Sequence, residues 1–327
     1  MALLTITDDF APWGGDWWSW SVWGDENFIY IGTYKYVTVY SLSSIGKLTE
    51  ISYLWIGDYV NGITGNNGYI YVANDASGLK TYSVSELGIL TPIDSHNPGG
   101  SMFKVWSDNG VSTQYLYTAT GNETLHKYSV LNGILTHISE YDIDNYLCTG
   151  VWGYGAYVYR TGQSAASISL WIHNANDLSI ADTVTVTGGI IGDDVWGNSV
   201  GNVVIFANNT AGIKSFSISS GILTFKSSHN PNRDPANYDD TCHRVHGNDN
   251  NVFVAGYEGG VHAYSLTNAM LTFVESHNDM SETYGIWNND NFVISVGKDR
   301  IVVYKITSSS SYPKINYFNR IQPFILN

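Results

Sequence analysis

The residues best able to do chemistry lie in one long polar segment, Ser227 to Asp249. It contains His243 and Arg244, with Asp240 shortly before them. A histidine beside carboxylates can act as general base in attack on a carbonyl carbon, while an arginine stabilises the oxyanion that forms. The segment therefore predicts His243, Arg244 and Asp240 as candidate catalytic residues. The alternative is that both basic residues form salt links with Asp239 and Asp240 and only hold a long loop in place.

Further polar residues are expected at the same end of the molecule, because they fall at or near the starts of equivalent strands. Polar groups that converge at one mouth of a closed fold are the usual lining of a ligand site. The candidate ligand-binding residues are Asp193, Asp194, Lys104, Arg233, Asp239 and Tyr284.

The segment from Trp13 to Asp25 is unusually rich in tryptophan. Alternation along a strand prevents all of these indoles from being buried together. Exposed indoles stack on sugar rings or anchor protein partners. Trp17 and Trp18 are therefore further candidate ligand-binding residues.

No cofactor and no metal site is predicted. The histidines of three Ser-His-Asn triplets, His96, His229 and His277, fall on equivalent outer positions that point away from one another, so they are expected to set loop conformations. Acidic pairs such as Asp142 and Asp144 leave Ca²⁺ as the alternative, although the D-x-D-x-D-G spacing is missing. The chain also lacks a nucleophile elbow, a phosphate-binding loop and a dinucleotide fingerprint.

The elements that must position these residues repeat along the whole chain. An aromatic residue, usually followed by serine, recurs every 40–48 residues, at Tyr40, Tyr82, Tyr128, Trp171, Phe216, Tyr264 and Tyr304. A leucine follows seven or eight residues later, usually in a G-x-L-T context, at Leu48, Leu90, Leu135, Leu178, Leu223 and Leu271. This period is typical of the four-stranded blades of a β-propeller.

A second set of landmarks has the same period. A V-W-G-D-like segment lies upstream of each aromatic residue, and its second position forms the row Trp23, Thr64, Trp106, Trp152, Trp196, His246 and Trp287. We expect these residues to pack between neighbouring blades, since indoles are usually buried. The repeats predict an all-β, seven-bladed β-propeller that occupies residues 1–327 as one domain.

The last repeat lacks a downstream leucine and threonine, whereas Leu4 and Thr5 supply them at the start of the chain. The N-terminal strand is therefore expected to join the last blade and close the ring, which leaves no open sheet edge. The C-terminal stretch KINYFNRIQPFILN is the alternative for the same place.

The repeat resembles known propeller families. The stretch YVANDASGLKTYSV, from Tyr71 to Val84, is similar to the YVTN repeats of surface-layer-type propellers and to LVIVD repeats. The stretch GLKTYSVSELGILTPIDSHNPGG is similar to blades of the seven-bladed lactonase family. The matched residues are packing and turn positions, so the resemblance implies the fold more than an activity. No catalytic motif of the lactonase family maps onto this chain.

Composition narrows the range of partners. The net charge of −14 argues against nucleic acid and against insertion into an anionic membrane. The sequence shows no signal peptide and no apolar run of membrane-spanning length, so we expect a cytoplasmic protein or a component of a surface or virion assembly.

The leading prediction is a non-catalytic binding or structural propeller that recognises a protein or a glycan. The alternative is a lactonase-like hydrolase or isomerase that acts on a small sugar-derived or acidic substrate at the channel mouth.

Overall fold

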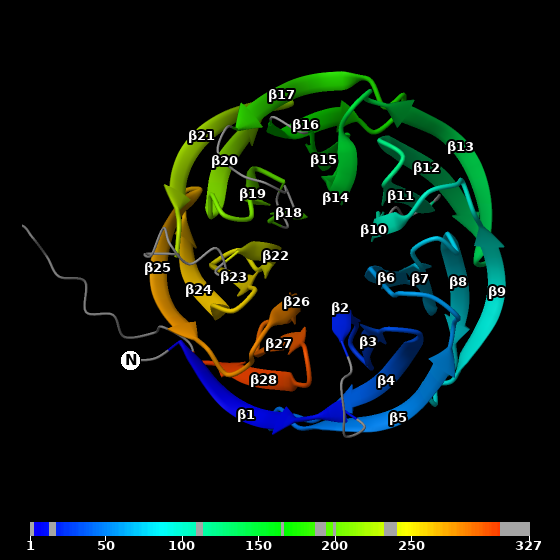
Figure 1. The fold of residues 1–327 in the computed structure, drawn as a ribbon, viewed down its shortest axis with the longest axis vertical. Coiled ribbons are helices and arrows are strands. Elements are labelled where there is room, and N and C mark those ends of the chain that lie inside the picture. Colours follow the sequence, from blue (N-terminus) through cyan, green and yellow to red (C-terminus); the bar gives the residue numbers. More distant parts are fainter. Residues whose placement is uncertain are drawn as a thin grey trace, which may run out of the picture.

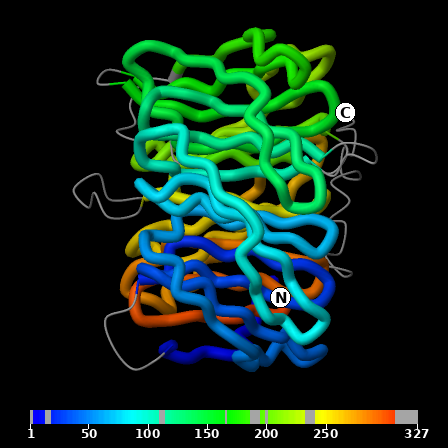
Figure 2. Tube along the Cα trace, turned by 90° about the vertical axis from the view of Figure 1, so that its right-hand side faces the viewer, coloured from blue at the N-terminus to red at the C-terminus, as the bar shows by residue number. Residues whose placement is uncertain are grey.

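Seven four-stranded antiparallel sheets are arranged around a central axis (Figure 1). The computed structural model describes residues 3–12, 18–108, 114–164, 167–186, 194–198, 201–231 and 241–307. Seen edge-on, the strands run across the thickness of the ring, so the loops gather on two opposite faces (Figure 2). The predicted seven-bladed, all-β propeller is confirmed.

Each blade runs from an inner strand at the axis to an outer strand at the rim. The inner strands of blades 1 to 7 are β2 (Ser19–Gly24), β6 (Gly62–Asn66), β10 (Met102–Ser107), β14 (Leu147–Tyr154), β18 (Asp194–Gly197), β22 (Cys242–Gly247) and β26 (Thr283–Asn288). The second strands are β3 (Ile29–Thr33), β7 (Tyr69–Ala73), β11 (Gln114–Thr120), β15 (Tyr157–Gln163), β19 (Val203–Ala207), β23 (Asn251–Gly256) and β27 (Phe292–Gly297).

The third strands carry the repeated aromatic residues. They are β4 (Tyr36–Leu42), β8 (Leu79–Val84), β12 (Thr124–Leu131), β16 (Ile168–Asn174), β20 (Ile213–Ser219), β24 (Gly260–Thr267) and β28 (Ile301–Ile306). The outer strands are β5 (Leu48–Trp55), β9 (Leu90–His96), β13 (Ile134–Asp142), β17 (Ile180–Val186), β21 (Ile222–His229), β25 (Met270–His277) and, in blade 7, β1 (Leu4–Phe10).

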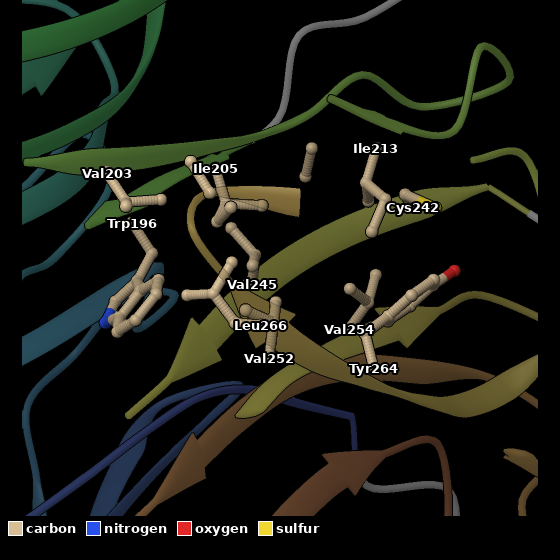
Figure 3. Close-up of a cluster of buried hydrophobic side chains, with 12 residues drawn as sticks. Trp196, Val203, Ile205, Ile213, Cys242, Val245, Val252, Val254, Tyr264 and Leu266 are labelled. Carbon is tan, nitrogen blue, oxygen red and sulfur yellow. The ribbon is translucent and has the colours of Figure 1, made fainter. Parts of the chain in front are cut away.

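The hydrophobic core lies between adjacent blades. One cluster joins Trp196, Val203 and Ile205 of blade 5 to Val245 and Tyr264 of blade 6 (Figure 3). The apolar residues of the second and third strands are buried on both faces because each face packs against a neighbouring sheet. The outer strands instead alternate between exposed and partly buried residues, since one face meets solvent. The core is therefore distributed around the ring.

The ring is closed by the N-terminal strand. Strand β1 pairs with β28 in an antiparallel register that runs from Leu4 opposite Ile306 to Phe10 opposite Ile301. Leu4 is buried in the same cluster as Tyr304 (Figure 1 shows β1 beside β28). The prediction of closure by the N-terminal strand is confirmed, and the competing C-terminal stretch lies outside the described residues.

The row of tryptophans packs between blades as predicted, and each ring lies against a glycine of the next blade. A methyl group on Gly65 would lie 2.6 Å from two ring carbons of Trp23, and one on Gly197 would lie 2.3 Å from the ring of Trp152. The same close approach joins Trp106 to Gly153, Trp196 to Gly247 and, across the closure, Trp287 to Gly24. An indole at one position therefore requires glycine at its partner position.

The two exceptions to this pairing fit the same rule. Thr64 takes the place of tryptophan in blade 2, and the partner position in blade 3 is Ser107 rather than glycine. His246 takes that place in blade 6, and its Nδ1 lies 2.7 Å from Oδ1 of Asn288 in blade 7. Glycine is thus replaced at the partner position in the two places where the row residue is not tryptophan.

Backbone hydrogen bonds around the rim link five of the blades to a neighbour at the position of the repeated leucine. The backbone N–H of Leu48, Leu135 and Leu223 donates to an aspartate of the preceding blade, at 2.8–2.9 Å. The acceptors are Asp8, Asp94 and Asp182. In blades 6 and 7 the N–H groups of Leu271 and Leu4 donate to Ser227 and Glu275. The leucine landmark therefore marks a contact between blades as well as a hairpin.

The histidines of the Ser-His-Asn triplets correct an expectation. Nδ1 of His96 lies 3.1 Å from the hydroxyl of Tyr128 in the next blade, and His229 makes the same contact with Tyr264. The following asparagine holds the loop, since Nδ2 of Asn97 donates to the backbone oxygen of Ala76. These histidines link blades, and the loop conformation depends on the asparagine.

Candidate functional site

One face of the ring carries the loops that enter the inner strands and the turns between second and third strands; we call it the upper face. Over blades 6, 7 and 1 this face holds an aromatic cluster of Trp18, Trp20, His243, Tyr257 and Tyr284, which we call the aromatic mouth. Trp18 precedes β2 and bridges to Lys298, which follows β27. Ring closure therefore places residues from both ends of the chain in one cluster.

Tyr284 lies at the centre of the aromatic mouth. Its ring stacks on Trp18 with an interplanar angle of 16° and a centroid separation of 5.7 Å, and it lies 4.5 Å from the ring of Trp20. The rings of His243 and Tyr257 approach it from blade 6, at 6.3 Å and 5.6 Å. Tyr284 is 6% exposed, whereas Trp18 is 37% exposed. The buried ring thus supports an indole that meets solvent.

A charged pair borders the aromatic mouth. The hydroxyl of Tyr284 donates to Oε2 of Glu282, and Nζ of Lys298 lies 3.3 Å from Oε1 of the same carboxylate. Burial opposes ionisation of Glu282, but the hydrogen bonds from Tyr284 and Lys298 outweigh it and hold the pKa of Glu282 below its usual range. Lys298 also lies 5.6 Å from the ring centroid of Trp18. Trp18 therefore presents its indole beside a fixed cation and anion.

The described contacts of His243 are one with a hydroxyl group and two with aromatic rings. Its Nε2 lies 2.8 Å from the hydroxyl of Thr241, and its ring packs against Tyr257 at 5.6 Å and against Tyr284. The contacts supply packing and a hydroxyl partner. The predicted neighbours Asp239 and Asp240 lie outside the described residues.

A second polar feature crosses the central channel. Nζ of Lys104 in blade 3 lies 3.0 Å from both carboxylate oxygens of Asp194 in blade 5. Asp194 also accepts the backbone N–H of Val245 in blade 6, at 3.3 Å. Burial within the ring lowers the pKa of Lys104, and the positive charge of Arg244 lowers it further. The Asp194 carboxylate acts in the opposite direction and raises it. This ion pair connects three blades across the axis.

A small cavity lies along the axis beside this ion pair. Its volume is about 220 Å³, and its walls are formed by Lys104, Asp194 and the tryptophan row. His246, which takes the place of tryptophan in blade 6, also lines this cavity, and burial lowers its pKa to about 4. The hydrogen bond with Asn288 favours the protonated ring, but burial outweighs it, so the ring is neutral at pH 7.

The structure divides the predicted site residues into two groups. Trp18, Tyr284 and His243 come together in the aromatic mouth. Lys104 and Asp194 instead meet in the channel, and Arg244 contributes to the electrostatics of that pair. Five further predicted residues lie outside the described residues: Trp17, Asp193, Arg233, Asp239 and Asp240. The polar segment between blades 5 and 6 is shorter than predicted, since β21 extends to His229 and β22 begins at Cys242.

Sequence analysis missed two members of the site, Tyr257 and Lys298. Both follow the second strand of a blade, and the repeat places such turns on the same face as the strand starts. The signal was therefore present in the blade period. Asp142 and Asp144, considered above for Ca²⁺, lie close to Glu123, with one carboxylate oxygen of each within 4.8 Å of the others.

No protein-family model matches the chain, and no curated protein matches its sequence. Among solved structures, the chain is similar to the β-propeller domain of Cps50 (Swd1) from Myceliophteria thermophila, with a TM-score of 0.72 and 12% identity over 93% of this chain and 100% of that chain. It is also similar to the computationally designed protein Ika8, with a TM-score of 0.57 and 12% identity over 91% of this chain and 99% of that chain. These similarities establish the β-propeller fold.

Within the described ranges, no helix is long and apolar enough to cross a membrane.

Proposed function

We propose that this chain is a non-catalytic binding propeller, and that a segment of a protein partner docks on the aromatic mouth. The observation that carries the proposal is the exposed indole of Trp18, stacked on Tyr284 and set beside Lys298. Aromatic side chains that are already held in place lose little conformational freedom on binding, so they contribute strongly to affinity. The net charge of −14 favours a neutral or basic partner.

The neighbouring blades extend this surface. Tyr34, in the turn after β3, is 41% exposed and packs edge-on against Tyr59 with a centroid separation of 4.5 Å. Nζ of Lys35 lies 4.9 Å from the ring centroid of Tyr34. This second aromatic pair lies on the same upper face, over blades 1 and 2, and gives an extended partner a second point of contact.

The test uses peptides selected from a random displayed library against the wild-type protein. Their affinities are then measured for Trp18→Ala and for Trp55→Ala, a control in which a 62% exposed indole is removed from the outer strand of blade 1. Loss of a central aromatic anchor costs about 2 kcal/mol or more, so we expect Trp18→Ala to weaken binding by about 30-fold. Trp55→Ala is expected to bind like the wild type. Equal affinity of Trp18→Ala and the wild type would contradict the proposal.

Two further assays separate the alternatives. The first is a glycan array. If wild type binds a glycan, Trp18→Ala abolishes that signal, and peptide binding does not depend on Trp18, the partner is a sugar and not a protein. A lactone hydrolysis assay that compares wild type with His243→Ala tests the hydrolase. Equal rates would end that alternative, whereas a loss of turnover in His243→Ala would contradict the non-catalytic reading.

A further inference from the structure

We propose that blade 3 carries a binding site for one divalent transition-metal ion, best suited to Zn²⁺, formed by His126, His137 and Glu140. Nδ1 of His126 lies 3.3 Å from Nε2 of His137 and 3.3 Å from Oε2 of Glu140. The third side of this triangle, from Nε2 of His137 to Oε2 of Glu140, is 3.7 Å. Three potential ligand atoms therefore lie within 4.8 Å of one another.

The strand register explains why these side chains share a face. His126 lies on β12 opposite Glu140 on β13, and Tyr128 lies opposite His137. The pairing shifts by one residue between these positions, so β13 contains a β-bulge at Ile138. A bulge adds one residue to a strand and changes its alternation. His137 and Glu140, three residues apart, consequently project to the same side.

The triangle has the dimensions of a zinc coordination sphere. Zn²⁺ binds imidazole nitrogen and carboxylate oxygen at about 2.0–2.2 Å in a tetrahedron, so its ligand atoms lie roughly 3.3–3.6 Å from one another. The three observed separations are 3.3, 3.3 and 3.7 Å. Two histidines and one carboxylate are also a ligand set that suits zinc.

Blade 6 shows what this position looks like without the ligands. His262 is the equivalent of His126, but Ser276 lies opposite it on β25, and Phe273 lies opposite the neighbouring Tyr264. The ring of His229 stacks on Phe273 with an interplanar angle of 14°, just as His96 stacks on His137 with an angle of 11°. Packing alone thus accepts phenylalanine at this place.

Comparison of blades 3 and 6 shows which residues are specific to the proposed metal site. Blade 3 has imidazole and carboxylate where blade 6 has a phenyl ring and a hydroxyl, while the buried histidine and the stacking partner are common to both. Nε2 of both His126 and His262 is buried without a hydrogen-bond partner among the described residues, so this feature belongs to the position and does not distinguish the two blades. The difference lies in His137 and Glu140.

Access to the site comes from the rim of the ring. The side chain of Glu140 is 59% exposed and that of His137 is 32% exposed, whereas His126 is nearly buried. Three protein ligands leave the fourth position of a zinc tetrahedron open. Water is the expected fourth ligand. The bound metal would tie β12 to β13 at the junction of blades 2 and 3, away from the aromatic mouth.

The test is a titration of tag-free, chelator-treated protein with ZnSO₄, followed by calorimetry and by thermal unfolding. We expect one equivalent to bind and to raise the melting temperature. His137→Phe copies blade 6 and preserves the stack with His96, and Glu140→Ser changes an exposed residue, so both variants are expected to fold. Because loss of even a supporting partner costs 10–100-fold in affinity, each is expected to weaken binding by at least ~100-fold. His229→Gln, which removes a histidine from another blade, is expected to bind like the wild type.

A transplant completes the design. Phe273→His combined with Ser276→Glu reproduces the three ligands in blade 6 and is expected to raise the stoichiometry to two. Replacement of Zn²⁺ by Co²⁺ reports on geometry, because tetrahedral Co²⁺ absorbs visible light strongly. Failure of the wild type to bind Zn²⁺ below millimolar concentration would overturn the proposal, as would unchanged binding in both His137→Phe and Glu140→Ser.

Discussion

The match between row residue and partner residue predicts strong coupling between Trp152 and Gly197. A Cβ atom on Gly197 would lie 2.3 and 2.4 Å from two carbons of the Trp152 ring. Carbon atoms prefer separations of about 3.5–4.0 Å, so the ring would have to move by roughly 1 Å. Overpacking of this kind costs about 1–3 kcal/mol, and we expect Gly197→Ser to lower the free energy of unfolding by that amount.

The reverse change removes the ring and leaves a gap. Loss of a packed tryptophan costs about 3–5 kcal/mol, so Trp152→Thr is expected to be more destabilising than Gly197→Ser. The double variant recreates the Thr64 and Ser107 pair that this chain already uses between blades 2 and 3. The serine then occupies space that the indole has left. We therefore expect the double variant to be more stable than the sum of the single effects by about 1–3 kcal/mol.

The assay is a double-mutant cycle in urea, with the free energy of unfolding taken from fluorescence and circular dichroism. A matched cycle uses Trp152→Thr with Ala156→Ser, a substitution in the adjacent turn after β14. This control pair is expected to be additive within about 0.5 kcal/mol. If the effects of Trp152→Thr and Gly197→Ser also add within about 0.5 kcal/mol, the proposed match between the indole and its partner glycine is refuted.

Three further predictions concern closure, pH and a buried charge. Removal of residues 3–10 should lower the melting temperature sharply, and a synthetic peptide of that sequence should restore it; unchanged melting would contradict closure by β1. Burial lowers the pKa of His173 to about 4, so on acidification the unfolded chain takes up a proton before the folded chain does, and stability falls between pH 6.5 and 4. His173→Asn should reduce this fall, measured as the melting temperature against pH. An unchanged slope would contradict the role of His173. Arg160 is fully buried, and its Nε and Nη2 have no hydrogen-bond partner among the described residues. Arg160→Met should therefore raise the free energy of unfolding in urea by on the order of 1 kcal/mol. A loss of about 2 kcal/mol or more would show that stacking of Arg160 on Trp171 outweighs the cost of burying its charge.

The blade period was sufficient to predict the fold. The aromatic, leucine and tryptophan landmarks each recur once per blade, and the displaced Leu4 indicated which strand completes the last blade. Repetition makes such a prediction robust, because every repeat must bury the same positions. The direction of packing around the ring was not predictable in the same way. The direction depends on which neighbouring blade each indole contacts. Trp23 of blade 1 packs against the glycine of blade 2, and the spacing along the sequence does not indicate this contact.

The candidate site was predicted only in part for a similar reason. Trp18 and Tyr284 come from opposite ends of the chain and meet because the ring closes. Lys104 and Asp194 are separated by a whole blade and meet across the axis, which no spacing along the sequence indicates. The ligands in blade 3 required the register of β12 and β13 and the position of a bulge. Each of these is a property of the assembled sheet.

The Lys104–Asp194 pair also holds together parts of the ring that are not neighbours. The two side chains meet across the axis at one end of the central cavity, and the hydrogen bond to Val245 holds the carboxylate in place. Blades 3 and 5 are separated by blade 4, so the pair links inner strands that the packing of adjacent blades leaves apart.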